Sequence, residues 1–239
     1  MSILPQLPPH SIAFGDIHGC YHAAQTAISL AEDIGAQAIF LGDYVDRGPS
    51  AVQTVNLLIE AKAKHPGWIF LRGNHDQMLI DLIDGVYQPE DFGEALGYIS
   101  YNLSQAVDSL NEWKRLEKGE QEKVTSFLKS TELYYETEQL IFVHGILRNT
   151  QQSLREKSID ELLWNYEPEP LWYGKRFIHG HWPTDSITQY GNGININTRC
   201  GYGGTLTGLL IDNMAAKPIK LFTISEEGEW LSEEPYSQQ

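Results

Sequence analysis

Residues 12–19 read Ile-Ala-Phe-Gly-Asp-Ile-His-Gly, a short apolar run followed by a glycine and two polar side chains that could bind a metal ion. The run predicts a buried strand, and the helical apolar spacing over Tyr21–Ile34 predicts that a helix follows it. The same order recurs at Gln37–Leu41, where Ser50 is the expected N-cap of the next helix, and a third strand is expected at Trp68–Leu71. Three strand–helix units of about 30 residues predict parallel strands whose C-terminal ends share one sheet edge, where open α/β sheets bind ligands.

After the first three units the sequence pattern becomes helical and then returns to short strands. Residues 81–129 are helical in pattern and carry scattered aromatic side chains. A helical cap beside the site within residues 85–130 is one interpretation, and aromatic packing of helices onto the sheet is the favoured one. From Glu132 onward short strands are expected, which suggests a largely antiparallel second sheet packed on the first, with a frayed end over residues 226–239. The expected strands are Leu133–Tyr135, Leu140–Val143, Arg176–Ile178, Ser186–Gln189, Ile194–Asn197, Leu206–Ile211 and Ile219–Ile224.

Length and composition restrict the classes of protein to which this chain can belong. The 239 residues fit a single domain, and 41% hydrophobic with 21% charged residues is typical of a globular chain. The net charge of −15 argues against nucleic acid as a partner, and bound cations would be needed to attract an anionic substrate. Only Cys20 and Cys200 occur, so we expect two free thiols in a reducing compartment. No apolar run is long enough for a signal peptide or a membrane span, so we expect a cytoplasmic protein with no membrane partner.

Potential metal ligands follow each of the first three strands. They are Asp16 and His18, then Asp43 and Asp46, then Asn74 and His75. One such loop carries little information, because Gly, Asp and Asn are common turn formers and a lone histidine is more often a buried core residue. Three in register, with three histidines after two later apolar runs, are not explained in that way; these are His144, His179 and His181. Mixed carboxylate, amide and imidazole donors suit two divalent ions better than a structural zinc site, which favours thiolates.

These segments resemble the signature motifs of the PPP-type metallophosphatases. Residues 15–19 (Gly-Asp-Ile-His-Gly), 42–48 (Gly-Asp-Tyr-Val-Asp-Arg-Gly) and 72–76 (Arg-Gly-Asn-His-Asp) match in order and at similar separations, and His144-Gly145 and Gly180-His181 are similar to two further motifs. The short chain resembles the bacterial and phage lambda-type serine/threonine protein phosphatases and the diadenosine tetraphosphatases. The resemblance implies a single calcineurin-like α/β domain over residues 1–239, with two mixed β-sheets packed as a sandwich and helices outside (αββα).

The resemblance also implies a role for each motif residue. Asp16 and His18 would hold one divalent ion, Asp43 would bridge two, and the second would be held by Asn74, His144 and His181. Mn²⁺ is the expected metal, with Fe or Zn²⁺ as alternatives. His75 would donate a proton to the leaving group, Asp46 would orient His75, and Arg47 would clamp phosphate. Such a metal pair can lower the pKa of a shared water, which attacks directly as a metal-bound hydroxide without a covalent enzyme intermediate; an imidazolium paired with a carboxylate can protonate a leaving alkoxide.

Several positions depart from the pattern of these relatives. Lambda-type enzymes carry an arginine after the Trp-Asn pair, and this chain has Tyr166 there. Arg199, which follows an expected strand, is a candidate replacement as a phosphate ligand, and a solvated surface arginine is the alternative. His179 has no counterpart among the ligands of the family and stays outside the predicted site.

The sequence thus predicts a two-metal-dependent phosphoesterase that hydrolyses phosphomonoesters. A serine/threonine protein phosphatase acting on phosphorylated proteins or peptides is the leading interpretation. The alternative is a dinucleoside polyphosphate hydrolase such as a diadenosine tetraphosphatase, with a small phosphoester or nucleotide as substrate. A non-catalytic metal-binding module is the remote alternative, because a pure binder has no need of a poised acid beside its metal site.

Overall fold

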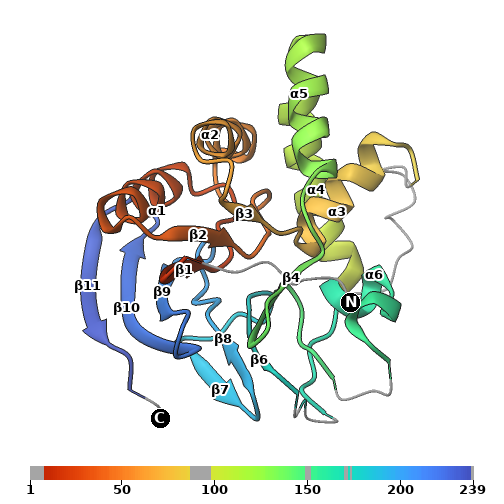
Figure 1. The fold of residues 1–239 in the computed structure, drawn as a ribbon. Coiled ribbons are helices and arrows are strands. Elements are labelled where there is room, and N and C mark those ends of the chain that lie inside the picture. Colours follow the sequence, from red (N-terminus) through yellow and green to blue (C-terminus); the bar gives the residue numbers. More distant parts are fainter. Residues whose placement is uncertain (1–7, 87–97, 149–151, 170–171, 173, 238–239) are drawn as a thin grey trace.

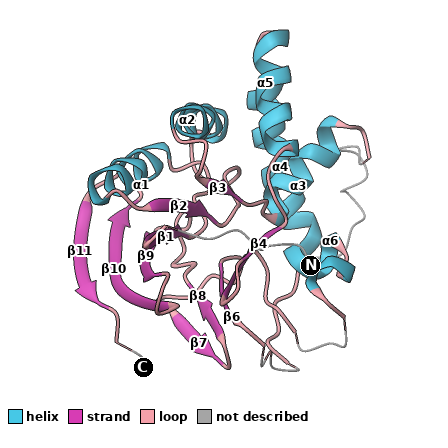
Figure 2. Ribbon diagram, in the orientation of Figure 1, coloured by secondary structure: helices cyan, strands magenta, loops and turns pink. Residues whose placement is uncertain are grey.

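A computed structural model describes residues 8–86, 98–148, 152–169, 172 and 174–237, which form two β-sheets and their covering helices (Figures 1 and 2). The first sheet has six strands in the order β11-β10-β9-β1-β2-β3. Its strands β1, β2 and β3 are parallel, whereas β9, β10 and β11 are antiparallel to their neighbours. Their bounds are β1 (His10–Phe14), β2 (Gln37–Phe40), β3 (Ile69–Phe70), β9 (Thr205–Asp212), β10 (Lys217–Ser225) and β11 (Trp230–Pro235).

The second sheet has five strands in the order β4-β5-β6-β8-β7. Strands β5, β6 and β8 are parallel, and β4 and β7 are antiparallel edge strands. Gly191-Asn192 is the turn between β7 and β8, and Gly191 has a φ of 51°, a conformation that favours glycine. The bounds are β4 (Tyr134–Glu136), β5 (Leu140–Val143), β6 (Arg176–His179), β7 (Thr188–Tyr190) and β8 (Gly193–Asn195).

Alternating side chains of β1 show how the layers are built. Ile12 and Phe14 belong to the core between the first sheet and its helices, while Ala13 belongs to the core between the two sheets. A third apolar cluster, which includes Val143 and Phe177, takes in Leu162 of α6. The described helices are α1 (Tyr21–Ile34), α2 (Ala51–Lys64), α3 (Asn74–Ile83), α4 (Tyr98–Lys114), α5 (Lys118–Lys129), a short 3₁₀ turn (Leu154–Glu156) and α6 (Ile159–Leu163). The predicted sandwich of two mixed sheets with helices outside is confirmed.

Strand partners differ from the prediction for the second half of the chain. Strands β9 and β10 do not enter the second sheet; β9 pairs with β1 in the first sheet, with Ile12 opposite Leu210. The second sheet is therefore not largely antiparallel, since three of its strands are parallel. The apolar pattern of a strand indicates that it is buried, but it does not specify which distant strand it joins.

The C-terminal segment was expected to fray, and this prediction is wrong for Trp230–Pro235. These residues form β11, which pairs with β10 at the edge of the first sheet. Five of its six residues are exposed. Backbone hydrogen bonds rather than side-chain burial hold this edge strand, so its sequence carries no alternating apolar pattern.

Helices α4 and α5 occupy much of the helical segment expected between the two halves. Phe127 of α5 is buried and packs against Tyr44 and Phe70, as the favoured packing interpretation predicts. Phe92 lies outside the described residues. Whether residues 85–130 act as a cap stays a prediction. Among the described helices, none combines the length and apolar character needed to cross a bilayer.

Candidate metal centre

Backbone hydrogen bonds join the loops that follow β1 and β2. The N–H groups of Ile17 and His18 both donate to the carbonyl of Asp43, at 3.1 and 2.8 Å, and Gly48 N–H donates to the carbonyl of His18 at 2.9 Å. The parallel pairing of β1 with β2 brings both loops to the same sheet edge. The first two motifs are thus held as one unit before any side chain is considered.

Asp76 joins the third motif to this unit. Its buried carboxylate accepts hydrogen bonds from the backbone N–H of Gly73 and Asp43 at 2.8 Å and of Tyr44 at 2.9 Å. Burial raises the pKa of Asp76 to about 7. Asn74 and His75 begin α3 rather than lying in a loop, and His75 N–H donates to Asp43 Oδ1 at 2.9 Å. The first turn of α3 therefore places Asn74 and His75 beside Asp43.

All six predicted metal ligands lie together and are at most 4% exposed. Ligand atoms of Asp16, His18 and Asp43 lie within 4.8 Å of one another, and so do those of Asp43, His144 and His181. Asp43 belongs to both groups. Asn74 Oδ1 lies 2.9 Å from His144 Nε2 and 2.8 Å from His181 Nδ1. The side chains are therefore arranged as two neighbouring ligand groups that share one carboxylate.

Asp16 is held in place by Asn197, to which sequence reasoning gave no role, and by the backbone of His181. Asn197 Nδ2 donates to Asp16 Oδ2 at 2.6 Å, across 181 positions of sequence, and His181 N–H donates to the same carboxylate at 3.1 Å. A Cβ atom at Gly180 would overlap the Asp16 carboxylate, so the close approach requires glycine. Asn197 lies at the end of an apolar run, as the predicted ligands do. Its position in the sequence could therefore have marked it as a candidate site residue.

Burial and neighbouring charges shift the pKa values of the ionisable groups in the cluster. Burial, followed by Arg47, lowers the pKa of His18, and burial, followed by His144, lowers that of His181, so both imidazoles are neutral. Burial raises the pKa of Asp16 to about 6. Burial alone would lower the pKa of His144, but the Asp43 carboxylate raises it to about 9.

The donor set also fits divalent metals. His181 Nε2 and Asn74 Nδ2 are buried polar atoms without a hydrogen-bond partner among the described residues. Such atoms are rare in a packed protein and need an explanation. An Asn74 oxygen that faces two histidine nitrogens is what a shared ligand set for one cation would present.

Several site residues adopt a backbone conformation that non-glycine residues seldom use. A φ between 47° and 69° occurs at His18, Asp43, Asp46, Arg47 and His181. Each such residue costs of order 1 kcal/mol or more, and such conformations cluster at functional sites. The hydrogen bonds and packing of the three loops that carry these residues hold their side chains in place at that cost.

His75 and Asp46 form a buried pair. His75 Nδ1 lies 2.6 Å from Asp46 Oδ2. The other carboxylate oxygen of Asp46 accepts a hydrogen bond from the hydroxyl of Ser109 at 2.5 Å, and the Ser109 oxygen accepts one from Asp46 N–H at 3.0 Å. Ser109 is 2% exposed and comes from α4. Sequence reasoning did not find it, because a single serine in a helix carries no signal.

The guanidinium of Arg47 contacts both His75 and His18. It donates to His75 Nε2 at 2.8 Å and to the His18 ring. It also lies 4.2 Å from the centre of the Tyr202 ring, within reach of a cation–π interaction. Arg47 therefore lies between the ligand group of His18 and the His75–Asp46 pair.

Arg199 lies farther out, at the rim of a pocket beside the cluster. The pocket has a volume of about 590 Å³ and is lined by Tyr166, Trp182, Pro183, Arg199 and Tyr202. Arg199 Nη1 forms an ion pair with Asp185 at 2.6 Å, and its side chain is 46% exposed. Tyr166, which stands where relatives carry an arginine, packs on the His181 ring with centroids 4.0 Å apart. The structure thus places Arg199 near the site but outside the buried ligand cluster.

His179 is a core residue. It is fully buried, its Nδ1 lies 2.8 Å from the carbonyl oxygen of Gly180, and its Nε2 contacts the hydroxyl of Tyr190. Burial lowers its pKa to about 3. These contacts satisfy both ring nitrogens without a metal ion.

A family model described as calcineurin-like phosphoesterase matches residues 10–227, which include every predicted site residue. The chain belongs to the calcineurin-like phosphoesterase family. It is therefore a metallophosphoesterase, and membership of this family implies divalent metal ions. The predicted family is confirmed.

Two kinds of relative accompany the family match. The serine/threonine-protein phosphatase PP1-1 of Saccharomyces cerevisiae is 41% identical over 92 residues, which are 36% of this chain and 29% of that protein. A putative diadenosine tetraphosphatase has a similar structure, with a TM-score of 0.66 and 19% identity over 92% of this chain and 96% of the other. A cold-active protein-tyrosine phosphatase of a Shewanella species has a TM-score of 0.56 and 16% identity over 96% and 82%. At these identities the two structures show a common fold.

Metal binding should release protons and strengthen as the pH rises. In the metal-free protein His144 is protonated below a pKa of about 9, and Asp16 below about 6. Each group must lose its proton to bind a cation, so we expect Mn²⁺ affinity to rise about tenfold per pH unit between pH 6.5 and 8. Titration calorimetry in two buffers of different ionisation enthalpy measures both the affinity and the protons released.

The matched control is Asp43→Asn, which removes the carboxylate shared by both ligand groups and should abolish most of the Mn²⁺ binding. An affinity for Mn²⁺ that does not change with pH in the unaltered protein would contradict the predicted proton release.

Proposed function

We propose that this metallophosphoesterase hydrolyses phosphomonoesters, and that phosphoserine and phosphothreonine side chains of proteins are its substrates. The observation that carries the proposal is the convergence of six buried side chains able to bind metal ions beside a buried His75–Asp46 pair. A local identity of 41% to a serine/threonine-protein phosphatase supports the substrate class.

Asp16, His18 and Asp43 would hold one divalent ion, and Asp43, Asn74, His144 and His181 the other. Two such ions supply a nucleophilic water of lowered pKa and neutralise charge on the phosphoryl oxygens. Mn²⁺ is the proposed metal. Protonation of the leaving group and binding of the phosphate are proposed for side chains around these ligands.

His75 is proposed to protonate the leaving oxygen. Its Nδ1 faces the Asp46 carboxylate at 2.6 Å, which stabilises a proton on that nitrogen and leaves Nε2 to face the substrate. Arg47 Nη2 donates to this Nε2 at 2.8 Å, so Nε2 carries no proton in this arrangement. For Nε2 to act as the acid, Arg47 would have to turn its donors to the phosphate oxygens of a bound substrate while His75 takes up a proton. The planar guanidinium can bind two phosphate oxygens at once.

A dinucleoside polyphosphate hydrolase is the second candidate. The pocket beside the cluster has aromatic side chains at Tyr166, Trp182 and Tyr202, on which a nucleobase could stack. The structural similarity to a putative diadenosine tetraphosphatase agrees with this candidate. A cytoplasmic location stays a prediction from the sequence.

The function is tested by turnover on a substrate panel. Purified protein should hydrolyse p-nitrophenyl phosphate with Mn²⁺, lose this activity in EDTA and regain it when Mn²⁺ is restored. On the panel, kcat/KM for phosphoserine and phosphothreonine peptides should exceed that for diadenosine tetraphosphate. The reverse order would favour the second candidate, and absence of any metal-dependent turnover would favour the non-catalytic binding module. Asp43→Asn is the inactive control.

Ser109 is proposed as a positioning residue for the His75–Asp46 pair. Ser109→Ala removes the 2.5 Å hydrogen bond to Asp46, which is expected to lower kcat about tenfold on a phosphoserine peptide, whose alkoxide leaving group needs a proton. The loss should be much smaller on p-nitrophenyl phosphate, because nitrophenolate leaves without one. Ser126→Ala, an exposed serine on α5, controls for a serine-to-alanine change in a helix. Equal losses on both substrates would indicate a merely structural role.

Arg199 is proposed to bind substrate phosphate or a neighbouring anionic group from the rim of the pocket. Arg199→Ala should raise KM several-fold, with a smaller effect on kcat, because a partly exposed cation contributes to binding more than to chemistry. Arg155→Ala, at an exposed arginine in the short 3₁₀ turn, is the matched control. Unchanged KM and kcat in Arg199→Ala would assign Arg199 to the solvated surface.

A further inference from the structure

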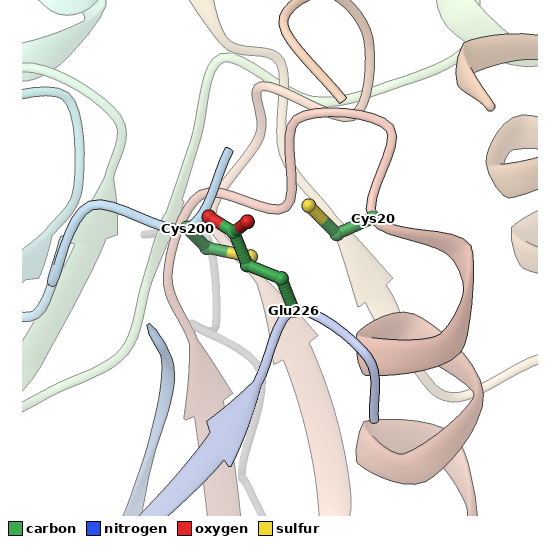
Figure 3. A group of neighbouring side chains, drawn as sticks. All are labelled: Cys20, Cys200 and Glu226. Carbon is green, nitrogen blue, oxygen red and sulfur yellow. The ribbon is translucent and has the colours of Figure 1, made fainter. Parts of the chain in front are cut away.

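Two cysteines that are 180 positions apart in sequence meet behind the loop that carries His18. Cys20 precedes α1, and Cys200 precedes β9. Their sulfur atoms and a carboxylate oxygen of Glu226 lie within 4.8 Å of one another. Figure 3 shows both sulfur atoms directed into the space between the two loops. Both thiols are free, and neither has a part in the proposed hydrolysis.

Both thiols contact the ligand-bearing loop directly. Cys20 Sγ donates to the carbonyl of His18 at 3.6 Å, and Cys200 Sγ donates to the carbonyl of Ile17 at 3.5 Å. Gly201, next to Cys200, lies so close to His18 that a Cβ atom there would be 2.6 Å from the histidine Cβ. The thiol pair therefore supports the backbone on which a proposed metal ligand stands.

Glu226 holds the turn after Cys200, which also carries Tyr202, the residue next to Arg47. Its Oε1 accepts hydrogen bonds from the backbone N–H of Gly201 and Gly203, both at 2.7 Å. Tyr202 lies between these two glycines, and its ring lies 4.2 Å from the Arg47 guanidinium. A displacement of Cys200 would therefore act on two neighbours at once, the His18 loop and the turn under Arg47.

We propose that Cys20 and Cys200 are a modification site, at which a peroxide forms a reversible disulfide that weakens metal binding by the Asp16–His18–Asp43 group. The inhibitory consequence rests on the proposed function, whereas formation of the disulfide does not. Transient disulfides of this kind are the usual form in which cysteines of reducing compartments act as redox sensors.

The chemistry balances with a peroxide as the oxidant. The sulfur of Cys20 attacks one peroxide oxygen, the O–O bond breaks, and the products are a sulfenic acid on Cys20 and one water. The sulfur of Cys200 then attacks the Cys20 sulfur, which forms the S–S bond and expels the second oxygen as water. Two thiols and one hydrogen peroxide thus give one disulfide and two waters.

The order of attack follows from exposure. Cys20 is 4% exposed and Cys200 is fully buried. The neighbouring Cys20 side chain and burial raise the pKa of the Cys200 thiol. Peroxide therefore reaches Cys20 first, and Cys200 acts as the resolving thiol.

The disulfide would disturb the His18 loop for two reasons. An S–S bond is about 2.0 Å long, so its formation fixes the two sulfur atoms, and the loops that carry them, at that separation. Oxidation also removes both S–H donors, which leaves the buried carbonyls of Ile17 and His18 without these hydrogen bonds. Since His18 already has a φ of 47°, the loop has little freedom to adjust while keeping its ligand atom in place.

The experiment combines thiol mapping with metal binding. The metal-free protein is treated with hydrogen peroxide, the peroxide is removed with catalase, and the chain is unfolded, alkylated and digested. We expect a peptide pair joined through Cys20 and Cys200 that disappears when dithiothreitol is added before alkylation. On the folded oxidised protein, Mn²⁺ affinity by calorimetry and turnover of p-nitrophenyl phosphate should each fall at least tenfold and recover with dithiothreitol.

The controls separate the possible failures. In Cys20→Ala and Cys200→Ala, alone and together, Mn²⁺ affinity should be the same before peroxide treatment and after it, once catalase has removed the peroxide. Both cysteines fully alkylated after peroxide would overturn the proposal, and so would a disulfide that leaves Mn²⁺ affinity unchanged. A zinc ion held by the thiols, lost from the double variant in elemental analysis, would overturn it in favour of a metal site. If the reduced protein binds Mn²⁺ but hydrolyses nothing, the proposed function fails while the disulfide test stands.

Discussion

The arrangement of this site depends on the carboxylate of Asp43. It belongs to both ligand groups, and it accepts a hydrogen bond from the first turn of α3 through His75 N–H. Its backbone carbonyl accepts two N–H groups from the loop after β1, and its own N–H donates to Asp76. Three strand–loop units therefore converge on one residue. Any change that moves Asp43 would move both proposed metal positions and the proposed proton donor together.

Residues from distant segments of the chain hold the side chains and backbone of this site in position. Ser109 of α4 holds Asp46, Asn197 holds Asp16, and the thiol pair Cys20–Cys200 supports the His18 backbone. Each of these contacts acts on a site residue rather than on a substrate. A mixed buried cluster of carboxylates and imidazoles needs such partners, because an unsatisfied or misplaced polar group inside a protein costs free energy.

Much of the fold, and the residues that the structure brings together as candidate ligands, could be predicted, and the errors have a common cause. The first three strands and the two helices between them were recognised because their apolar periodicity is local and strong. The partners of β9 and the existence of β11 were not, since β9 joins β1 from nearly 200 residues away and β11 is held by backbone pairing at an exposed edge. The start of α3 at Asn74 was also missed, because its N-cap is Gly73 with an Asp76 carboxylate rather than a serine or threonine.

The amino-acid sequence by itself determined the family and the order of the candidate ligands, because each motif lies within a few consecutive residues at the end of an apolar strand. Only the tertiary structure decided which helix supplies the Ser109 hydroxyl, which asparagine orients Asp16, and that Cys20 and Cys200 are neighbours. These contacts join residues 63 to 181 positions apart. Local periodicity specifies a local conformation. Contact between residues so far apart in sequence depends instead on how all the layers of the fold pack, because closing such long loops costs conformational entropy.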